Sequence, residues 1–242
     1  MLREALALGV DHIDTSDFYG PYVANEQIRK ALAPYPANLV LVTKIGAYRD
    51  DKGAWLHDVA PAFLRKSVED NLKRLGLAQI PIVNLRIAGP DEDVATPMKV
   101  MRALQEEGLI AHIGISTVDA AQLQTARAIA PIVCVQNHYN LVHRTDDAMI
   151  DALAADGIAY VPYFPLGGFM PIQSTGLQKV ADELGQSAQT VALAWLLQRS
   201  PNILLIPGTS RRAHLRDNIA AASLTFDKPH LDRLNALAGL AA

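Results

Sequence analysis

Short apolar runs rich in β-branched residues recur along the chain, and stretches with helical spacing of apolar residues separate them. These runs are almost continuously apolar, which is typical of parallel strands buried on both faces. We predict strands at residues 12–16, 39–44, 82–87, 112–116, 132–137, 158–163 and 203–207. Strands that alternate with helices in this way predict parallel βαβ units.

The stretches between these runs predict amphipathic helices, for example through Leu64, Val68, Leu72 and Leu75. Polar residues suited to helix N-caps and glycines suited to helix ends bound several of them. The predicted N-caps are Asp119 and either Thr145 or Asp146, and the predicted ends are Gly9, Gly76, Gly108, Gly157 and Gly185.

Two architectures fit this alternation, a doubly wound sheet and a (β/α)8 barrel. The G-x-G-x-x-G fingerprint of the dinucleotide-binding doubly wound fold is absent after the first strand. Polar residues instead follow nearly every predicted strand, as they do in barrels. We therefore predict one barrel domain over residues 1–242. Because a closed barrel needs eight strands, we expect the first one upstream of Met1. Between strands 12–16 and 203–207 we then expect either a gap or a segment from outside this sequence.

Composition narrows the class of protein. Half of the 242 residues are apolar, 19% are charged, and the net charge is −3. The chain has no long basic run, which argues against nucleic-acid binding. A single cysteine, Cys134, excludes an internal disulfide and suits a reducing compartment. No apolar stretch reaches membrane-spanning length, and the N-terminus lacks the pattern of a signal peptide, so we predict a cytoplasmic protein.

The stretch HIDTSDFYG (12–20) ends an apolar run with ionisable and hydrogen-bonding residues. In a barrel, Asp14 and Tyr19 of this stretch would lie at the same rim as Lys44 and Arg86, which end the next two strands. A plainer interpretation is a polar turn that caps the next helix. Likewise, Lys44 and Arg86 could serve only in structural ion pairs.

The four groups suggest one chemistry. A free tyrosine is a poor acid at pH 7, but a neighbouring Lys44 ammonium would favour the phenolate of Tyr19, and Asp14 could hold Lys44 in place. Such a tyrosine can protonate a carbonyl oxygen while hydride reaches the carbon. That reaction is carbonyl reduction, which needs a nicotinamide cofactor.

Several separated motifs resemble those of the aldo-keto reductase family. They are GVDHIDTSDFYG (9–20) followed by NEQIRKAL (25–32), VTKIG (42–46), VQNHYN (135–140), PYFPLGG (162–168) and IPGTSRRAHLRDN (206–218). The resemblance covers essentially the whole chain and is strongest for a bacterial subgroup of NADPH-dependent reductases that act on pyridoxal. It implies a (β/α)8 barrel, NADPH as cofactor and a small aldehyde as substrate.

The resemblance also implies residue roles. Tyr19 would be the proton donor, Lys44 would lower its pKa, and Asp14 would pair with Lys44. The cofactor would contact Ser116 and Gln136 at the carboxamide, Tyr163 at the ring, Pro165, Leu166 and Gly167 at the pyrophosphate, Pro207, Gly208, Thr209 and Ser210 at the adenosine phosphate, and Asn218 near the adenine. Arg211 or Arg212 could clamp a 2′-phosphate, although such a pair is also common at a solvated helix entry.

The chain departs from the family pattern at four positions. Arg86 replaces a histidine, Thr117 an asparagine, and Gly208 and His214 replace basic residues of the phosphate loop. An arginine is always charged, so we expect Arg86 to orient an oxygen-rich or anionic edge of the substrate, such as that of pyridoxal.

Two aromatic and two histidine residues are candidates for a substrate pocket or a metal site. Trp55 and Phe169 could line the substrate pocket, or simply pack against neighbouring loops. His138 and His143 lack a carboxylate at ligand spacing, so we predict no metal site.

Two function classes follow from these residues. The first is an NADPH-dependent reductase of pyridoxal or of another aldehyde or ketone. The second is a nucleotide-binding regulatory module with little turnover. The Asp14, Tyr19 and Lys44 set favours the enzyme, because a sensor needs no proton donor.

Overall fold

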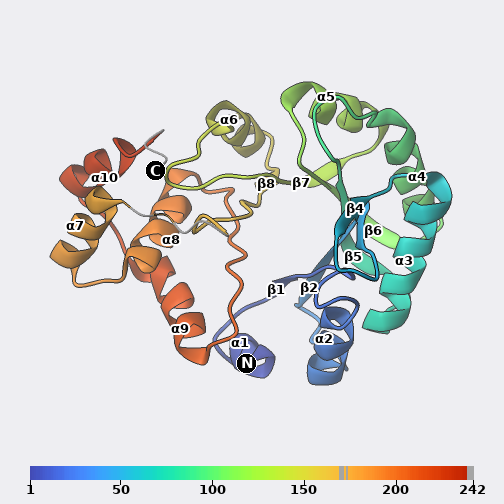
Figure 1. Cartoon of the computed structure of the whole chain (residues 1–242), viewed down its shortest axis with the longest axis horizontal. Coiled ribbons are helices and arrows are strands. Elements are labelled where there is room, and N and C mark those ends of the chain that lie inside the picture. Colours follow the sequence, from blue (N-terminus) through green and yellow to red (C-terminus); the bar gives the residue numbers. More distant parts are fainter. Residues whose placement is uncertain (169–171, 173, 239–242) are drawn as a thin grey trace. The chain divides into compact units, whose positions relative to one another are not determined.

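The computed structural model describes residues 1–168, 172 and 174–238. These residues divide into two compact units, which are described one at a time. The N-terminal unit comprises residues 2–136, and the C-terminal unit comprises the described residues from 137 onward. Figure 1 labels most of their helices and strands.

The N-terminal unit is a parallel sheet covered by helices (Figure 1). Its elements are α1 (Leu2–Ala7), β1 (His12–Asp14), α2 (Ala24–Leu32), β2 (Val40–Ile45), β3 (Ala47–Arg49), β4 (Trp55–His57), α3 (Pro61–Leu75), β5 (Ile80–Arg86), α4 (Ala95–Glu106), β6 (Ile110–Ser116), α5 (Ala120–Ile129) and β7 (Ile132–Gln136). Within this unit the parallel strands lie in the order β1-β2-β5-β6-β7, and β3 and β4 form an antiparallel hairpin. Helices α2 to α5 pack each against the next.

The sheet register brings polar side chains of neighbouring strands into line. Lys44 pairs with Asn84, Asn84 with Gly114, and Gly114 with Cys134. One step further along, Arg86 pairs with Ser116 and Ser116 with Gln136. Since side chains alternate between the faces of a strand, the residues of these two rows point to the same face of the sheet.

The helix signals in the sequence are confirmed where they were most specific. Asp119 caps α5 in a capping box with Gln122, and Gly76 and Gly185 end their helices in the left-handed conformation. Asp146 precedes α6 but makes no capping bond, because its carboxylate accepts from Asn137 and Tyr160 instead.

The C-terminal unit is mainly helical. Its elements are α6 (Asp147–Ala155), β8 (Ala159–Tyr160), α7 (Thr175–Leu184), α8 (Ala188–Arg199), α9 (Arg212–Ala220), the 3-10 helix η1 (Ala221–Ser223) and α10 (Lys228–Asn235). Helix α8 has an apolar middle that is almost fully buried. It packs against α7, α9 and η1.

Two strand predictions need correction. The predicted strand 158–163 is only the two-residue β8, and the predicted strand 203–207 is no strand. In the latter segment only Ile203 pairs, in a single parallel bridge with Tyr160. An apolar run identifies a buried segment, but strand geometry also needs a continuous hydrogen-bonding partner.

Candidate active site

The most buried charged group of the N-terminal unit is the pair of Lys44 and Asp14. Lys44 is the penultimate residue of β2 and Asp14 is the last residue of β1, so two neighbouring parallel strands bring them together. Their side chains are 4% and 5% exposed and form an ion pair. The Lys44 Nζ also donates to the main-chain oxygen of Thr15 at 3.1 Å. These partners replace the water that both charges lose on burial.

Tyr19 lies next to this pair. The Lys44 Nζ is 5.2 Å from the centre of the Tyr19 ring, and the Tyr19 side chain is exposed. Burial alone would lower the pKa of the Lys44 ammonium, but the Asp14 carboxylate and the Tyr19 phenol outweigh burial and raise that pKa. Lys44 therefore keeps its positive charge beside a solvent-accessible phenol.

Gln136 joins the pair from the end of β7. Its Nε2 donates to the second Asp14 oxygen, Oδ2, at 3.0 Å. The sequence predicted Gln136 as a ligand of the cofactor carboxamide, and its amide nitrogen is here engaged with Asp14. Ser116, at the end of β6, is buried, and its hydroxyl lies 3.4 Å from that of Thr117.

Arg86 is held mainly through its backbone. The Nε2 of His57 donates to the main-chain oxygen of Arg86 at 2.9 Å. Gly46 lies against the same oxygen, since a Cβ at this position would be 2.4 Å from it, and its φ of +98° is one that side chains disfavour. No carboxylate pairs with the Arg86 guanidinium among the described residues.

The β3–β4 hairpin brings Trp55 to the same region. Its ring lies 3.9 Å from the Arg49 guanidinium and 5.4 Å from that of Arg86. It also packs edge-on against Phe18, 4.8 Å away between ring centres. Trp55 therefore lies beside Arg86 and against Phe18, the residue that precedes Tyr19. Phe169 lies outside the described residues.

The remaining predicted cofactor residues belong to the C-terminal unit. Tyr163 follows β8, and its ring stacks on that of His138 at 5.6 Å and 9°. His138 in turn stacks on His143. Pro165 is buried, while Leu166 and Gly167 are half-buried.

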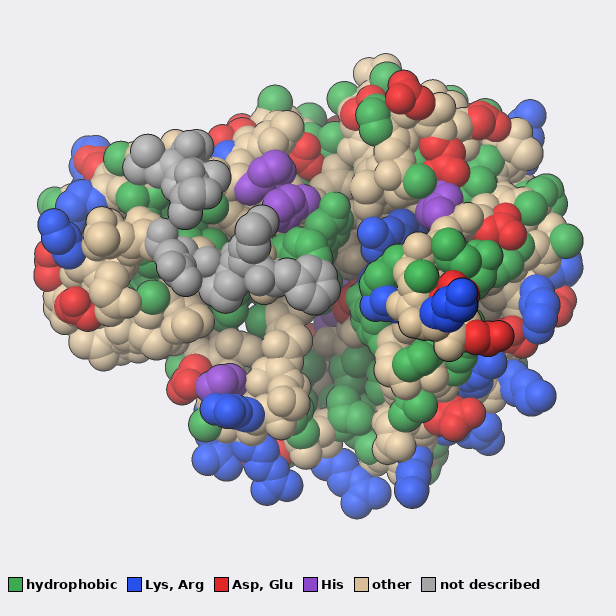
Figure 2. All heavy atoms as spheres, viewed as in Figure 1, with side chains coloured by type: hydrophobic (Ala, Val, Ile, Leu, Met, Phe, Trp, Pro, Cys, Tyr) green, Lys and Arg blue, Asp and Glu red, His purple; other side chains and the backbone are tan. Residues whose placement is uncertain are grey.

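Residues 207–211 form an open loop that leads into α9. The Arg211 N–H donates to the Thr209 hydroxyl at 3.1 Å, and the Asn218 side chain reaches the Pro207 oxygen at 3.5 Å. Nothing lies within 4 Å of a Cβ built on Gly208. Ser210, Arg211 and Arg212 are exposed. Figure 2 shows Lys and Arg side chains gathered around α9.

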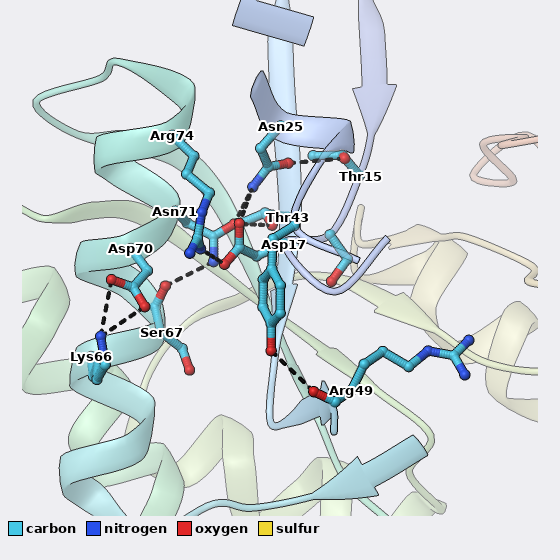
Figure 3. A network of polar contacts seen from close by, with 12 residues as sticks. Thr15, Asp17, Asn25, Thr43, Arg49, Lys66, Ser67, Asp70, Asn71 and Arg74 are labelled. Atoms are coloured by element: carbon cyan, nitrogen blue, oxygen red, sulfur yellow. Dashed lines mark hydrogen bonds and ion pairs between the residues drawn. The ribbon is translucent and has the colours of Figure 1, made fainter. Parts of the chain in front are cut away.

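Sequence reasoning missed a second polar group behind Tyr19. It consists of Thr15, Asp17, Asn25, Thr43, Asn71 and Arg74 (Figure 3). One signal was available, because Asn71 continues the apolar stripe of α3, between Val68 and Leu75. A polar residue on the buried stripe of a helix requires partners in the core.

Comparison with known proteins identifies the family. A model of the aldo/keto reductase family matches residues 1–238. The chain belongs to the aldo/keto reductase family. It is 57% identical over 243 residues to a pyridoxine 4-dehydrogenase of Escherichia coli, covering 98% of this chain and 85% of that protein. It is 38% identical over 235 residues to an uncharacterised oxidoreductase of Schizosaccharomyces pombe, covering 97% and 76%.

Solved structures agree on the fold. A thermostable aldo-keto reductase, solved with the inhibitor epalrestat, matches with a TM-score of 0.84 and 27% identity, over 98% of this chain and 85% of that one. An aldo/keto reductase of Klebsiella pneumoniae, solved with NADP and acetate, matches with a TM-score of 0.83 and 23% identity, over 98% and 83%. The predicted barrel of the aldo-keto reductase type is thus confirmed, and this aldo/keto reductase is an oxidoreductase.

Proposed function

We propose that this aldo/keto reductase reduces the aldehyde of pyridoxal to the alcohol of pyridoxine with NADPH. The observation that carries the proposal is the buried Lys44 ammonium, which lies between the Asp14 carboxylate and the exposed Tyr19 phenol. The 57% identical relative named pyridoxine 4-dehydrogenase supports the choice of substrate.

Tyr19 is the proton donor in this proposal. Its O–H donates to the carbonyl oxygen of the aldehyde and protonates it as negative charge develops there. The Lys44 ammonium stabilises the resulting phenolate, and Asp14 keeps Lys44 charged and in place. Reduced nicotinamide, when bound, supplies the hydride to the carbonyl carbon.

Cofactor contacts are proposed separately for each unit. In the N-terminal unit, the Ser116 hydroxyl and the Gln136 Oε1 are the groups proposed for the carboxamide, since the Gln136 Nε2 is bonded to Asp14. In the C-terminal unit, Tyr163 and the turn of Pro165, Leu166 and Gly167 are proposed for the ring and the pyrophosphate.

The phosphates of the adenosine end are proposed to bind the loop 207–210. Space at Gly208, the N-terminus of the nine-residue α9 and the exposed Arg211 and Arg212 suit an anion. These arginines would favour NADPH over NADH through the 2′-phosphate, with Asn218 near the adenine.

Arg86 is proposed to contribute to substrate specificity. Its permanent charge beside Trp55 would attract an oxygen of pyridoxal next to the aldehyde. Replacing Arg86 with His should raise the KM for pyridoxal more than the KM for simple aldehydes. Equal losses for both substrates would show that Arg86 does not select between them.

No helix among the described residues is both long and apolar enough to cross a membrane. Burial raises the pKa of the Cys134 thiol to about 12, which makes it unreactive. A lone buried thiol suits the reducing interior of the cell, and we propose a cytoplasmic enzyme that acts on a small molecule.

The test is the rate of NADPH consumption with pyridoxal. Tyr19→Phe should lower kcat at least a hundredfold, because only the acidic hydroxyl is removed. The matched control is Tyr35→Phe, which removes a hydroxyl that donates to the main-chain oxygen of Leu75 and lies outside the segment that carries Tyr19. A wild-type protein that binds NADPH without consuming it would instead favour the regulatory module.

A further inference from the structure

Two buried asparagines lie behind the segment that carries Tyr19. We call residues 15–23, which connect β1 to α2, the Tyr19 loop. Asn25 in the first turn of α2 and Asn71 in the last turns of α3 are 0% exposed. Figure 3 shows their side chains facing one another between the loop and the two helices. Burying two amides is costly unless every polar atom is bonded.

Asn25 ties the two ends of the Tyr19 loop together. Its Oδ1 accepts from the Thr15 hydroxyl at 3.0 Å, at the start of the loop. Its Nδ2 donates to Asp17 at 3.2 Å and to Asn71 at 2.7 Å. Asp17 also pairs with Arg74 of α3.

Asn71 extends this hydrogen-bond network to β2, the strand that carries Lys44. Its Oδ1 accepts from Asn25 and also from the Thr43 hydroxyl at 2.6 Å. Its Nδ2 donates to the Ser67 main-chain oxygen at 2.8 Å, within α3. Thr43 is itself fully buried and immediately precedes Lys44.

The pattern of donors and acceptors permits one arrangement. Rotating either amide by half a turn would place nitrogen against nitrogen or oxygen against oxygen at the Asn25–Asn71 contact. The side chains therefore fix a single register between the Tyr19 loop, α3 and β2, as fully satisfied polar networks do.

Packing alone leaves the loop incompletely supported. A cavity of about 220 Å³ lies beside it, lined among others by Asp17, Tyr22, Tyr48, Phe63 and Asn71. Tyr22 has a φ of 64°, a strained conformation for this residue. Specific bonds must therefore restrain the loop where apolar contact does not.

We propose that Thr15, Asn25, Asn71 and Thr43 are positioning residues that fix the Tyr19 phenol relative to the Lys44 ammonium. The inference rests on the proposed function for the role of Tyr19 as proton donor. It adds that the reactive geometry depends on four side chains that touch neither substrate nor cofactor.

The experiment compares Thr43→Val, which removes the hydroxyl at nearly constant volume, with Thr43→Ser, which keeps it. The same pair at Thr15 tests the other end of the network. The first readout is the NMR signal of the Tyr19 ring in protein without ligands, identified by its absence from the same protein carrying Tyr19→Phe. The second is kcat and KM for pyridoxal and NADPH.

Thr43→Val should shift the Tyr19 ring signal, because the phenol moves away from Lys44. It should also lower kcat about tenfold with both KM values within twofold, and Thr43→Ser should restore both properties. The same pattern is expected at Thr15.

A Thr43→Val protein that melts earlier but keeps the wild-type Tyr19 ring signal and kcat would overturn the inference, because the role of Thr43 would then be stability alone. Failure of the proposed function gives a different result. If the wild type is inactive on pyridoxal but the positioning inference holds, Thr43→Val still shifts the Tyr19 ring signal.

Discussion

The two groups of candidate site residues are held in different ways. In the N-terminal unit, Asp14 and Lys44 are buried and bonded to each other, to Gln136 and to main-chain oxygen. In the C-terminal unit, the loop 207–211 is largely exposed and is held by contacts within itself and to α9. Proton transfer needs a fixed geometry before the substrate arrives, whereas an anion-binding loop can be ordered by its ligand.

The largest effect on activity should come from a substitution in the buried pair of Asp14 and Lys44. Lys44→Met removes the charge beside Tyr19 and leaves the buried Asp14 carboxylate unpaired, so kcat should fall about a thousandfold. Steady-state NADPH consumption measures it. Lys66→Met, at an exposed lysine paired with Asp70, is the control and should change kcat less than twofold. Equal rates for both variants would contradict the role of Lys44.

The next test concerns the backbone under Arg86. Gly46→Ala should destabilise the protein by about 2–4 kcal/mol, since its φ is positive and the new Cβ meets the Arg86 oxygen. Gly53→Ala has a φ of +79° but no atom within 4 Å, so it should cost only about 1 kcal/mol. Denaturant unfolding measures both. Equal losses of unfolding free energy in the two variants would show that the close approach of Gly46 to the Arg86 main-chain oxygen is not important for stability.

In the exposed loop, the effects should be smaller and confined to the cofactor. Arg211→Ala or Arg212→Ala should raise the KM for NADPH about tenfold, through loss of a charge-assisted bond to the 2′-phosphate. The KM for NADH and kcat should not change. Arg216→Ala, one turn along α9, is the control. If the KM values for NADPH and NADH rise together, the arginines do not bind the 2′-phosphate.

The smallest expected effect is a pH dependence of the free energy of unfolding, which comes from Asp17 in the Tyr19 loop. Burial raises the pKa of Asp17 from 3.8 to about 6, and Arg74 offsets only part of that rise. Between about pH 6 and 4 the folded state therefore binds a proton that the unfolded state does not, so this group stabilises folding as pH falls.

Relative to Asp17→Asn, the wild type should thus gain about 1–2 kcal/mol of unfolding free energy between pH 7 and 4.5, with screening by solvent included. Urea unfolding of both proteins at both pH values measures this gain. The contributions of the other carboxylates are the same in both proteins and cancel in the comparison. A relative loss on acidification would mean that the Arg74 pair dominates and holds the Asp17 pKa low.

The sequence predicted the parts of the molecule that repeat a simple pattern. The strand ends at Asp14, Lys44 and Arg86 follow from apolar runs that stop at a polar residue, and the structure keeps them within a residue or two. The prediction of a strand at 203–207 was wrong because an apolar run does not reveal whether a neighbouring strand is available along its length.

Other features depend on contacts between distant residues, which no local pattern reports. Trp55 reaches Arg86 only through the three-residue strands β3 and β4, which are too short to give a periodic signal. The Asn25–Asn71 bond joins residues 46 positions apart. Its trace in the sequence is a single asparagine in the apolar stripe of α3.

The most direct test of the central claim is transfer of label. Wild-type protein is incubated with pyridoxal and NADPH deuterated at both C4 positions, and the product is analysed by mass spectrometry. The account predicts pyridoxine with one deuterium on the carbon of the former aldehyde, formed by the wild type and almost absent with Lys44→Met. Cofactor that binds while pyridoxal is recovered without deuterium would contradict it.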